Sequence, residues 1–452
     1  MKNSRIATAI ASVGLGISCV AAYAANPGVS LVGVGSVPGT DLDKSGLAGQ
    51  SICAADDPAS CIDKATLGGF GSAITYTGFG NVFIAVPDRG PYDGRTDEPY
   101  LDRVHFMRIT TAVDALFPNV GATLLATRFL KAGRDNLVGS SSAFERRFDP
   151  EGVAVGLLGT FYVSDEYGPY INEFLPSGRL LRKIRVPDRF QIANPSGEVD
   201  SAGNSLELYP SFNVSGRQAN RGMEGLAITP NGRYLVGIMQ NALIQDNGLN
   251  TSTPPGRRGL NNRILKVDLV TGRTQEFVYT VDAINQGRGV NEMLAINDHE
   301  FLVLERDNRP MAPTPPNAAQ SPNLKRIYRI DLRAATDVSG VDVLPETGAA
   351  LADLGITPVT KALFIDLLDP SYKVSDTQTI KDVVAEKLEA LAWGPDLPDG
   401  RHLLYVASDN DLYPGRPTQI YAFAIDGTPE GANLDFVRQR VLLPAYLPFP
   451  AR

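Results

Sequence analysis

One short pattern recurs along the chain and constrains the fold more than any other feature. It is a glutamate, followed by glycine in two of its four copies, then an apolar residue and alanine. Its copies begin at Glu151, Glu224, Glu292 and Glu389, with a degenerate first copy over residues 71–74. Shortly after each copy comes an apolar run that ends in polar or charged residues, such as 161–166. Self-similarity of this kind indicates a repeat architecture.

Further strand-like segments follow these runs and are joined by glycine-containing turns. Residues 172–175 precede 180–186, with Pro176-Ser177-Gly178 between them, and residues 263–268 precede 274–279 in the same way. Alternating apolar residues on both sides of such turns are typical of β-hairpins. Four antiparallel strands in each repeat make one blade of a β-propeller.

Five blades are legible in the sequence, and two further segments are expected to close the ring. Residues 29–37 and 434–443 are predicted strands that would complete a sixth blade. The predicted fold is therefore all-β, a β-propeller of six four-stranded blades with long inserted loops. Those loops cover residues 191–220, 241–261, 306–325 and 333–387. The 44 glycines and 32 prolines fit many turns and argue against a helical bundle.

The amino-terminal residues 1–24 are predicted to be a secretory signal peptide. Lys2 and Arg5 precede an apolar run over 6–20, and small residues precede a cleavage point before Ala25. A lipoprotein signal ending at Cys19 is the alternative. The mature chain, 25–452, is then a single propeller domain in the periplasm or outside the cell. No later segment is long and apolar enough to predict a membrane span.

Export changes the interpretation of the cysteines, because cleavage leaves Cys53 and Cys61. An isolated pair in an oxidising compartment predicts a local disulfide. Metal binding by the pair is the alternative. The formal charge is 42 − 50 = −8, which argues against non-specific binding to nucleic acid.

The repeat predicts that many carboxylates meet at one mouth of the propeller. The recurrent glutamates start the innermost strands, and the second strands end in acidic residues. The carboxylates expected to act in catalysis are Glu151, Glu224, Asp165 and Glu166, and those expected to bind metal are Asp88, Glu292, Glu305, Asp307, Glu389, Asp409 and Asp411. So many acids in one place repel each other unless cations balance them.

Oxygen ligands without histidine or cysteine favour calcium, or another hard divalent cation, as the cofactor. Arg89, Arg306 and Arg221 are expected to hold an anionic substrate. The alternative for both sets is that acids and arginines form ion pairs with one another in neighbouring blades.

Other mechanisms lack their motifs in this chain. There is no Gly-x-Ser-x-Gly elbow and no phosphate-binding Gly-x-x-x-x-Gly-Lys loop. The three histidines, His105, His299 and His402, are isolated and lack metal-ligand spacing. Metal-assisted hydrolysis remains, with a cation that polarises the substrate and activates water.

Several motifs resemble those of the bacterial phytase-like domain family, described as "esterase-like activity of phytase". They are Phe70–Ile74 with Pro87–Pro91, Asp149–Gly152, Val163–Tyr170, Gly222–Ala227 and Ser408–Asp411. The resemblance covers about residues 29–426, and it departs from the pattern at Ala73, Met293 and Ala390. It implies an exported β-propeller and hydrolysis of phosphate or carboxyl esters.

The leading functional prediction is an exported phosphomonoesterase that acts on small anionic esters such as inositol phosphates. Divalent cations among the mouth carboxylates would bridge to the substrate phosphates. One alternative is a propeller that binds a ligand, glycan or envelope partner without catalysis. Another is a calcium-dependent carboxyl-esterase or lactonase. The fold cannot decide between these, because propellers host all of them.

Overall fold

The computed structural model describes most of the chain after the predicted signal peptide. The described residues are 26–54, 57–92, 99–140, 143–168, 170–194, 213–250, 252, 256–282, 288–309, 323–374 and 384–443. The predicted signal peptide and its cleavage point lie outside them.

Five antiparallel four-stranded sheets form the blades of a β-propeller. The first contains β4 (Ala73–Tyr76), β5 (Val82–Val86), β7 (Arg103–Thr111) and β8 (Val120–Phe129). The second contains β12 (Pro150–Val155), β13 (Phe161–Asp165), β14 (Ile171–Phe174) and β15 (Leu180–Ile184). The third contains β16 (Met223–Ile228), β17 (Tyr234–Met239), β18 (Asn261–Asp268) and β19 (Thr274–Thr280). The fourth contains β20 (Gly289–Ala295), β21 (Glu300–Arg306), β22 (Lys325–Asp331) and β23 (Thr360–Asp366). The fifth contains β24 (Leu388–Trp393), β25 (His402–Ser408), β26 (Thr418–Ile425) and β1 (Val29–Val37).

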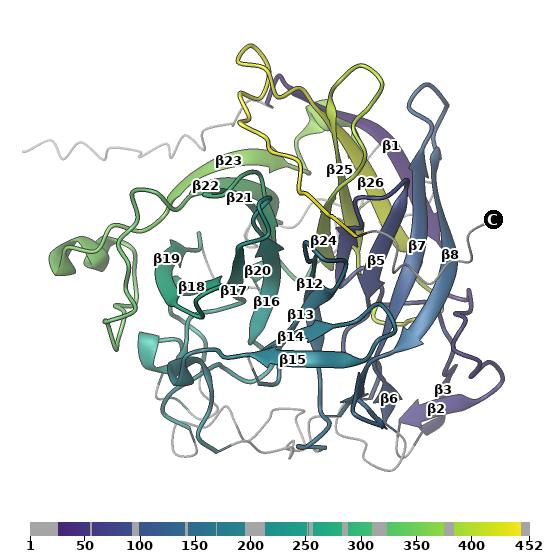
Figure 1. The fold of residues 1–452 in the computed structure, drawn as a ribbon, viewed down its shortest axis with the longest axis horizontal. Coiled ribbons are helices and arrows are strands. Elements are labelled where there is room, and N and C mark those ends of the chain that lie inside the picture. The colour runs from purple at the N-terminus through teal and green to yellow at the C-terminus, as the bar shows by residue number, and fades with distance from the viewer. Residues whose placement is uncertain are drawn as a thin grey trace, which may run out of the picture.

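The ring closes with five blades, so the expectation of a sixth is wrong for the described residues. The inner strands β4, β12, β16, β20 and β24 contact one another in a closed cycle. The strand predicted over 29–37 is present as β1, but it pairs with β26, with Val29 opposite Ile425. It therefore fills the outer position of a blade to which the carboxyl-terminal part contributes three strands. Figure 1 shows the purple β1 beside β26, whose colour lies near the other end of the chain.

Residues 434–443, the other predicted strand, form no strand and instead cross the far end of the ring. We call this segment the strap. Its backbone N–H groups donate to turns that follow inner strands: Val437 to Ile296, Arg440 to Pro230 and Leu442 to Leu157, at 2.9, 3.2 and 2.8 Å. The strap is the yellow segment that runs across the central strands in Figure 1. These contacts hold the ends of three blades in place.

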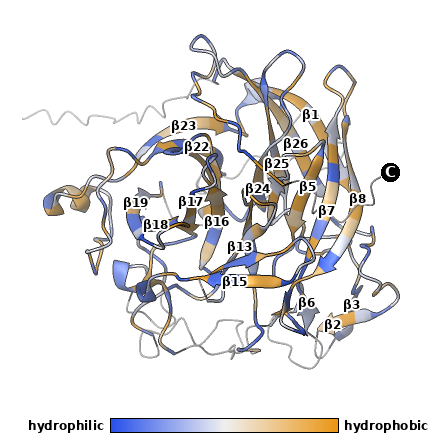
Figure 2. Ribbon diagram, in the orientation of Figure 1, coloured by the Kyte–Doolittle hydropathy of each residue, from blue (hydrophilic) through white to orange (hydrophobic). Residues whose placement is uncertain are grey.

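The core consists of apolar layers between neighbouring blades, because each sheet is covered on both faces. Phe161 and Phe174 stack at 5.6 Å between ring centroids, and Phe148 packs against Phe174 at 5.8 Å. The blade strands are mostly orange in Figure 2, whereas much of the blue lies in the connections. Burial on both faces explains why the second strands read as continuous apolar runs.

Each of four inner strands carries a β-bulge where it leaves the mouth. The register shifts between Pro150 and Val153, between Met223 and Gly225, between Val290 and Glu292, and between Leu388 and Ala390. A bulge turns the extra residue out of the ladder and redirects its side chain. In the second, third and fifth blades that extra position holds the recurrent glutamate.

In the second and third blades the glycine of the repeat stands where the next inner strand approaches closely. A Cβ on Gly152 would lie 2.6 Å from the carbonyl oxygen of Glu224, and one on Gly225 would lie 2.5 Å from the Met293 nitrogen. These distances leave no room for a side chain without a backbone shift. The pattern therefore records both a bulge and a tight contact between blades.

Shorter elements lie outside the blades. The ribbon pairs are β2 (Ser51–Ala54) with β3 (Asp57–Asp63), β6 (Tyr100–Leu101) with β11 (Val138–Gly139), and β9 (Lys131–Ala132) with β10 (Asp135–Asn136). The 3-10 helices are η1 (Asp188–Phe190), η3 (Ile244–Asp246), η5 (Ala349–Leu354) and η6 (Pro370–Tyr372). Among the described residues, no helix has the length and apolar character needed to cross a bilayer.

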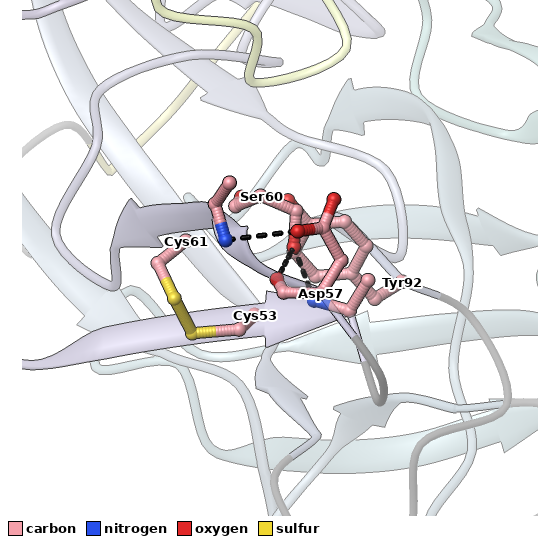
Figure 3. Close-up of a disulfide and its surroundings, with 7 residues drawn as sticks. Cys53, Asp57, Ser60, Cys61 and Tyr92 are labelled. Atoms are coloured by element: carbon pink, nitrogen blue, oxygen red, sulfur yellow. Dashed lines mark hydrogen bonds between the residues drawn. A yellow bond between two sulfur atoms is a disulfide. The ribbon is translucent and has the colours of Figure 1, made fainter.

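The predicted disulfide is confirmed and joins the two strands of the β2–β3 hairpin. Cys53 and Cys61 are bonded across the hairpin, as Figure 3 shows. The Tyr92 hydroxyl donates to the Ser60 carbonyl beside them. Ile52 of the same hairpin is buried against Tyr100 and Leu412. The hairpin is thereby fixed to loops of the first and fifth blades.

Candidate functional site

A polar cavity of about 250 Å³ opens at the mouth, where the inner strands begin. Its lining includes four cations, Arg89, Arg221, Arg306 and Lys387, and seven acids, Asp88, Glu151, Glu166, Glu224, Glu386, Glu389 and Asp411. The formal charge of these groups is 4 − 7 = −3. The structure thus brings together most, but not all, of the acids that the repeat predicted, together with all three predicted arginines.

Glu151 is the acid that stands out in this cavity. It is 93% buried, counting its 7% relative exposure, and has no hydrogen-bond or ion-pair partner in the described part of the chain. Burial, followed by the charges of Glu224 and Asp149, raises the pKa of Glu151 well above its usual range. Buried carboxylates are normally hydrogen-bonded or paired. An unpartnered one that faces a cavity could therefore contact a ligand.

Glu224 lies beside it with half of its carboxylate engaged. Its Oε1 accepts from Gln240 Nε2 at 2.6 Å and from Asn291 Nδ2 at 2.9 Å. Its Oε2 is buried without a partner in the described structure. Burial, with the charge of Glu166 next, raises the pKa of Glu224 well above its usual range.

Arg221 is the predicted arginine that keeps donors available. Its Nη1 donates to Gln240 Oε1 at 2.6 Å and to the Asn220 carbonyl at 2.9 Å. Its Nε and Nη2 have no partner among the residues described. Arg221 can therefore donate to an anion in the cavity without breaking an existing contact.

Arg89 is instead committed to the acids on the second blade. Its Nη1 lies 2.7 Å from Asp149 Oδ2 and 3.4 Å from Glu166 Oε2, and its backbone nitrogen donates to Asp149 Oδ1 at 2.9 Å. Burial raises the pKa of Asp149 to about 7. One carboxylate oxygen from each of Asp149, Glu151 and Glu166 lies within 4.8 Å of the others. This buried group could hold a metal ion.

A second group of acids, predicted as metal ligands, surrounds the ammonium of Lys387. Its Nζ lies 2.8 Å from Asp409 Oδ2, 2.5 Å from Asp411 Oδ1 and 4.0 Å from Asp88 Oδ2. Burial raises the pKa of Asp88 to about 6. The predicted repulsion among these acids exists, but a lysine of the chain already balances it.

Arg306 balances Glu389 in the same way. The two side chains form a buried ion pair, and Lys387 Nζ lies 3.8 Å from the same carboxylate oxygen. Arg306 also donates to Asn308. Of the predicted substrate-binding arginines, Arg306 and Arg89 therefore fit the alternative of ion pairing.

Its repeat position predicted that Glu292 would lie at the mouth, but the structure places it away from the mouth. In the fourth blade the bulge falls on Asn291, so Glu292 occupies the position of Gly225 in the third blade. Its Oε1 accepts from the backbone nitrogens of Met293 and Leu226 at 2.8 and 3.1 Å. It lines the apolar channel below the mouth, so its placement does not support a role in the mouth cavity.

Glu305 and Asp307 are also outside the cavity and are balanced by lysines. Glu305 accepts from Lys361 Nζ and from the Tyr279 hydroxyl, each at 2.5 Å. Asp307 is fully buried with Lys325 Nζ at 2.9 Å. Both acids fit the ion-pair alternative and not a shared metal site.

Asp165 lies behind the mouth and faces a different cavity. Its Oδ1 accepts from the backbone nitrogens of Asp149 and Tyr167, both at 3.1 Å. Burial raises its pKa to about 7. It supports the backbone of Asp149, and it does not line the mouth cavity.

The sequence prediction missed several residues of the site, among them Asp149, Lys387, Gln240 and Asn291. Asp149 stands two residues before a recurrent glutamate, and Lys387 stands two residues before another, so position relative to the repeat was an available signal. Gln240 and Asn291 carry no charge and no motif. Their roles follow from contacts at the closed ring: Gln240 contacts Glu224 and Arg221 within the third blade, and Asn291 contacts Glu224 from the fourth.

Comparison with known proteins identifies the family. The model of the phytase-like family, described as "esterase-like activity of phytase", matches residues 65–412. The chain therefore belongs to this phytase-like family. A protein of Arthroderma benhamiae, described as an uncharacterized secreted protein, is 30% identical over 349 residues. The match covers 62% of this chain and 63% of that relative, so the chain spans less than two thirds of the relative's length.

Among solved structures, similarity is remote. Hydrazine synthase of Kuenenia stuttgartiensis shows 12% identity and a TM-score of 0.30, covering 76% of this chain and 78% of that one. A member of the DUF4221 family from Bacteroides vulgatus shows 8% identity and a TM-score of 0.30, covering 89% of this chain and 99% of that one.

Proposed function

We propose that this protein is an exported hydrolase of phosphate esters that works with a hard divalent cation, calcium first, at the propeller mouth. The observation that carries the proposal is a carboxylate without a partner in the same cavity as a guanidinium with donors still available. Glu151 has no partner in the described chain, and Arg221 keeps two nitrogens available in the same cavity. A buried site that leaves opposite charges unused is suited to a ligand that carries both.

Glu151, Glu166 and Asp149 would hold the cation, with the free oxygen of Glu224 nearby. Carboxylate oxygens are the ligands that calcium prefers. The raised pKa of Glu151 also fits, because a cation would favour the ionised form that burial opposes. When bound, such a cation polarises the ester and activates water for attack.

Arg221 would hold the phosphate oxygens, since a guanidinium matches their geometry. A carboxylate of Glu151 or Glu224 would take the proton of the attacking water. The family description supports ester hydrolysis, and the secreted relative and the disulfide support export directed by residues 1–24.

Calcium titration by isothermal calorimetry, together with hydrolysis of nitrophenyl phosphate and nitrophenyl acetate with and without chelator, tests the proposal. We expect calcium binding, and calcium-dependent release from the phosphate ester. Glu151→Gln should weaken calcium binding about tenfold or more, since it removes one charged ligand. Glu346→Gln, at a half-exposed surface pair with Arg258, is the control and should bind as the unchanged protein does.

Three outcomes would change the conclusion. Absence of calcium binding would mean that the acids serve only as structural ion pairs. Ester binding without turnover would favour a ligand-binding propeller. Calcium-dependent hydrolysis of the acetate ester alone would favour a carboxyl-esterase or lactonase.

A further inference from the structure

Gln240 lies between Glu224 and Arg221, the carboxylate and the guanidinium to which the proposed function gives opposite roles. It follows β17 and is buried. Its Nε2 donates to Glu224 Oε1 at 2.6 Å, and its Oε1 accepts from Arg221 Nη1 at 2.6 Å. A single amide thus contacts the carboxylate with its donor and the guanidinium with its acceptor.

Hydrogen bonds hold the backbone of Gln240 in place, and this limits the positions that its side-chain amide can reach. Its nitrogen donates to the Gly222 carbonyl at 2.9 Å, and its carbonyl accepts from the Val290 nitrogen at 3.1 Å and from Asn262 Nδ2 at 2.8 Å. These bonds tie the third blade to the start of the fourth. The position of the amide is therefore set by the ring itself.

Without this amide, Glu224 and Arg221 are a pair that should collapse. A guanidinium and a carboxylate in a buried setting attract strongly and tend to form two parallel hydrogen bonds. Such a pair would use Glu224 Oε2 and the free nitrogens of Arg221. Gln240 hydrogen-bonds to one atom of each group and leaves Glu224 Oε2 and the other Arg221 nitrogens available to a ligand.

We propose that Gln240 is a positioning residue that holds Glu224 and Arg221 apart, so that the mouth binds a divalent cation and an oxyanion together, as calcium with a phosphate group. This inference rests on the proposed function, and it adds that the two ligands bind cooperatively. The bound cation reduces the repulsion between the mouth carboxylates and the anion. The bound anion in turn adds negative charge next to the cation. Each ligand then raises the affinity for the other by the same factor.

Calorimetry on the full mature chain tests this, with calcium chloride and phenyl phosphate as probes, separately and together. We expect calcium to tighten phenyl phosphate binding about tenfold, within the usual range of coupling between sites. In Gln240→Met, Arg221 pairs with Glu224, so calcium binding should weaken about tenfold and the coupling should vanish. Gln245→Met is the matched control, because that amide also bridges two groups but lies outside the cavity.

A second substitution separates collapse of the pair from simple damage. Adding Arg221→Met to Gln240→Met removes the competing guanidinium, so calcium affinity should return, whereas phenyl phosphate binding should be lost with the arginine. Arg221→Met alone, at a half-buried position, should keep calcium binding and lose the coupling, which keeps the test valid if Gln240→Met folds poorly.

The outcomes distinguish this inference from the proposed function. If the unchanged protein binds calcium but phenyl phosphate affinity does not respond, the cooperative pair is refuted and the cation site stands. If no calcium binds, both are refuted. If Gln240→Met keeps the coupling, or if the double variant fails to recover calcium binding, Gln240 does not act by separating the charges.

Discussion

Lys387 provides the sharpest test of how the mouth tolerates so many acids. Its ammonium contacts Asp409 and Asp411 directly and lies 4.0 Å from Asp88. Lys387→Met keeps the length of the side chain and removes the charge. We expect the variant to fold with a clear loss of stability, because it leaves a fully buried Asp409 carboxylate without its cation.

The size of the loss follows from burial. Removing one partner of a buried ion pair costs about 3–5 kcal/mol, whereas the contact with the half-exposed Asp411 contributes below about 1 kcal/mol. Unfolding entropy scales with length, so for a chain of this size each kcal/mol lowers the melting temperature by about 1 °C. The expected decrease is therefore about 3–5 °C in chelator at neutral pH.

Calcium should then restore part of the loss in this variant. Asp88, Asp409 and Asp411 keep oxygens within 4.8 Å of one another, and removal of the ammonium opens that group to a cation. At ten times its dissociation constant, calcium would return about 1.4 kcal/mol. The variant should thus gain more from calcium than the unchanged protein does.

Calorimetric or fluorimetric melting with chelator and with calcium measures both effects. Lys266→Met is the control, because Lys266 lies over the Tyr234 ring with no ion pair in the described structure. If Lys387→Met melts within 1 °C of the unchanged protein in chelator, the acids do not depend on the lysine and the electrostatic reasoning is wrong.

Two further predictions concern regions away from the mouth. Burial lowers the pKa of His105 to about 4, so the folded protein holds it neutral while the unfolded chain takes up a proton below about pH 6.5. The contribution of His105 to the free energy of unfolding should therefore fall by about 3 kcal/mol as the pH drops from 6.5 to 4, and an NMR titration midpoint of this ring near 6.5 would contradict it. Trp393, the single tryptophan of the chain, packs on Phe436 of the strap at 4.8 Å, so Phe436→Ala should shift its emission to the red; an unchanged maximum would show that the strap does not shield the ring.

Strand positions were predictable because each blade strand has both an apolar pattern and a turn beside it. The segment 29–37 was predicted and is present as β1. Its pairing partner was not predictable, because an alternating apolar pattern indicates a strand but does not indicate which strand it pairs with. Residues 434–443 share the apolar spacing of a strand, but their side chains fill the end of the channel. That difference produced the extra blade in the prediction.

The sequence predicted that acidic residues gather at the mouth, but it did not predict which basic residues pair with them. Glu292 shares the repeat letters, yet a bulge displaced by one residue exchanges it with Asn291. The sequence does not reveal where a bulge falls. The balance of charge also depends on residues from different blades, as Lys387 meeting Asp88 shows. Such pairings exist only once the ring is closed.

The pairing of β1 with β26 sets the order in which this molecule can assemble. Val29 and Ile425 are 425 − 29 = 396 residues apart and face each other in one ladder. In a chain that emerges amino-terminus first, β1 remains unpaired until the other three strands of the last blade have been made. Contacts this distant in sequence slow folding. Moving β1 behind β26 by circular permutation would make the final blade local, so the permuted chain should close its ring sooner than the natural one.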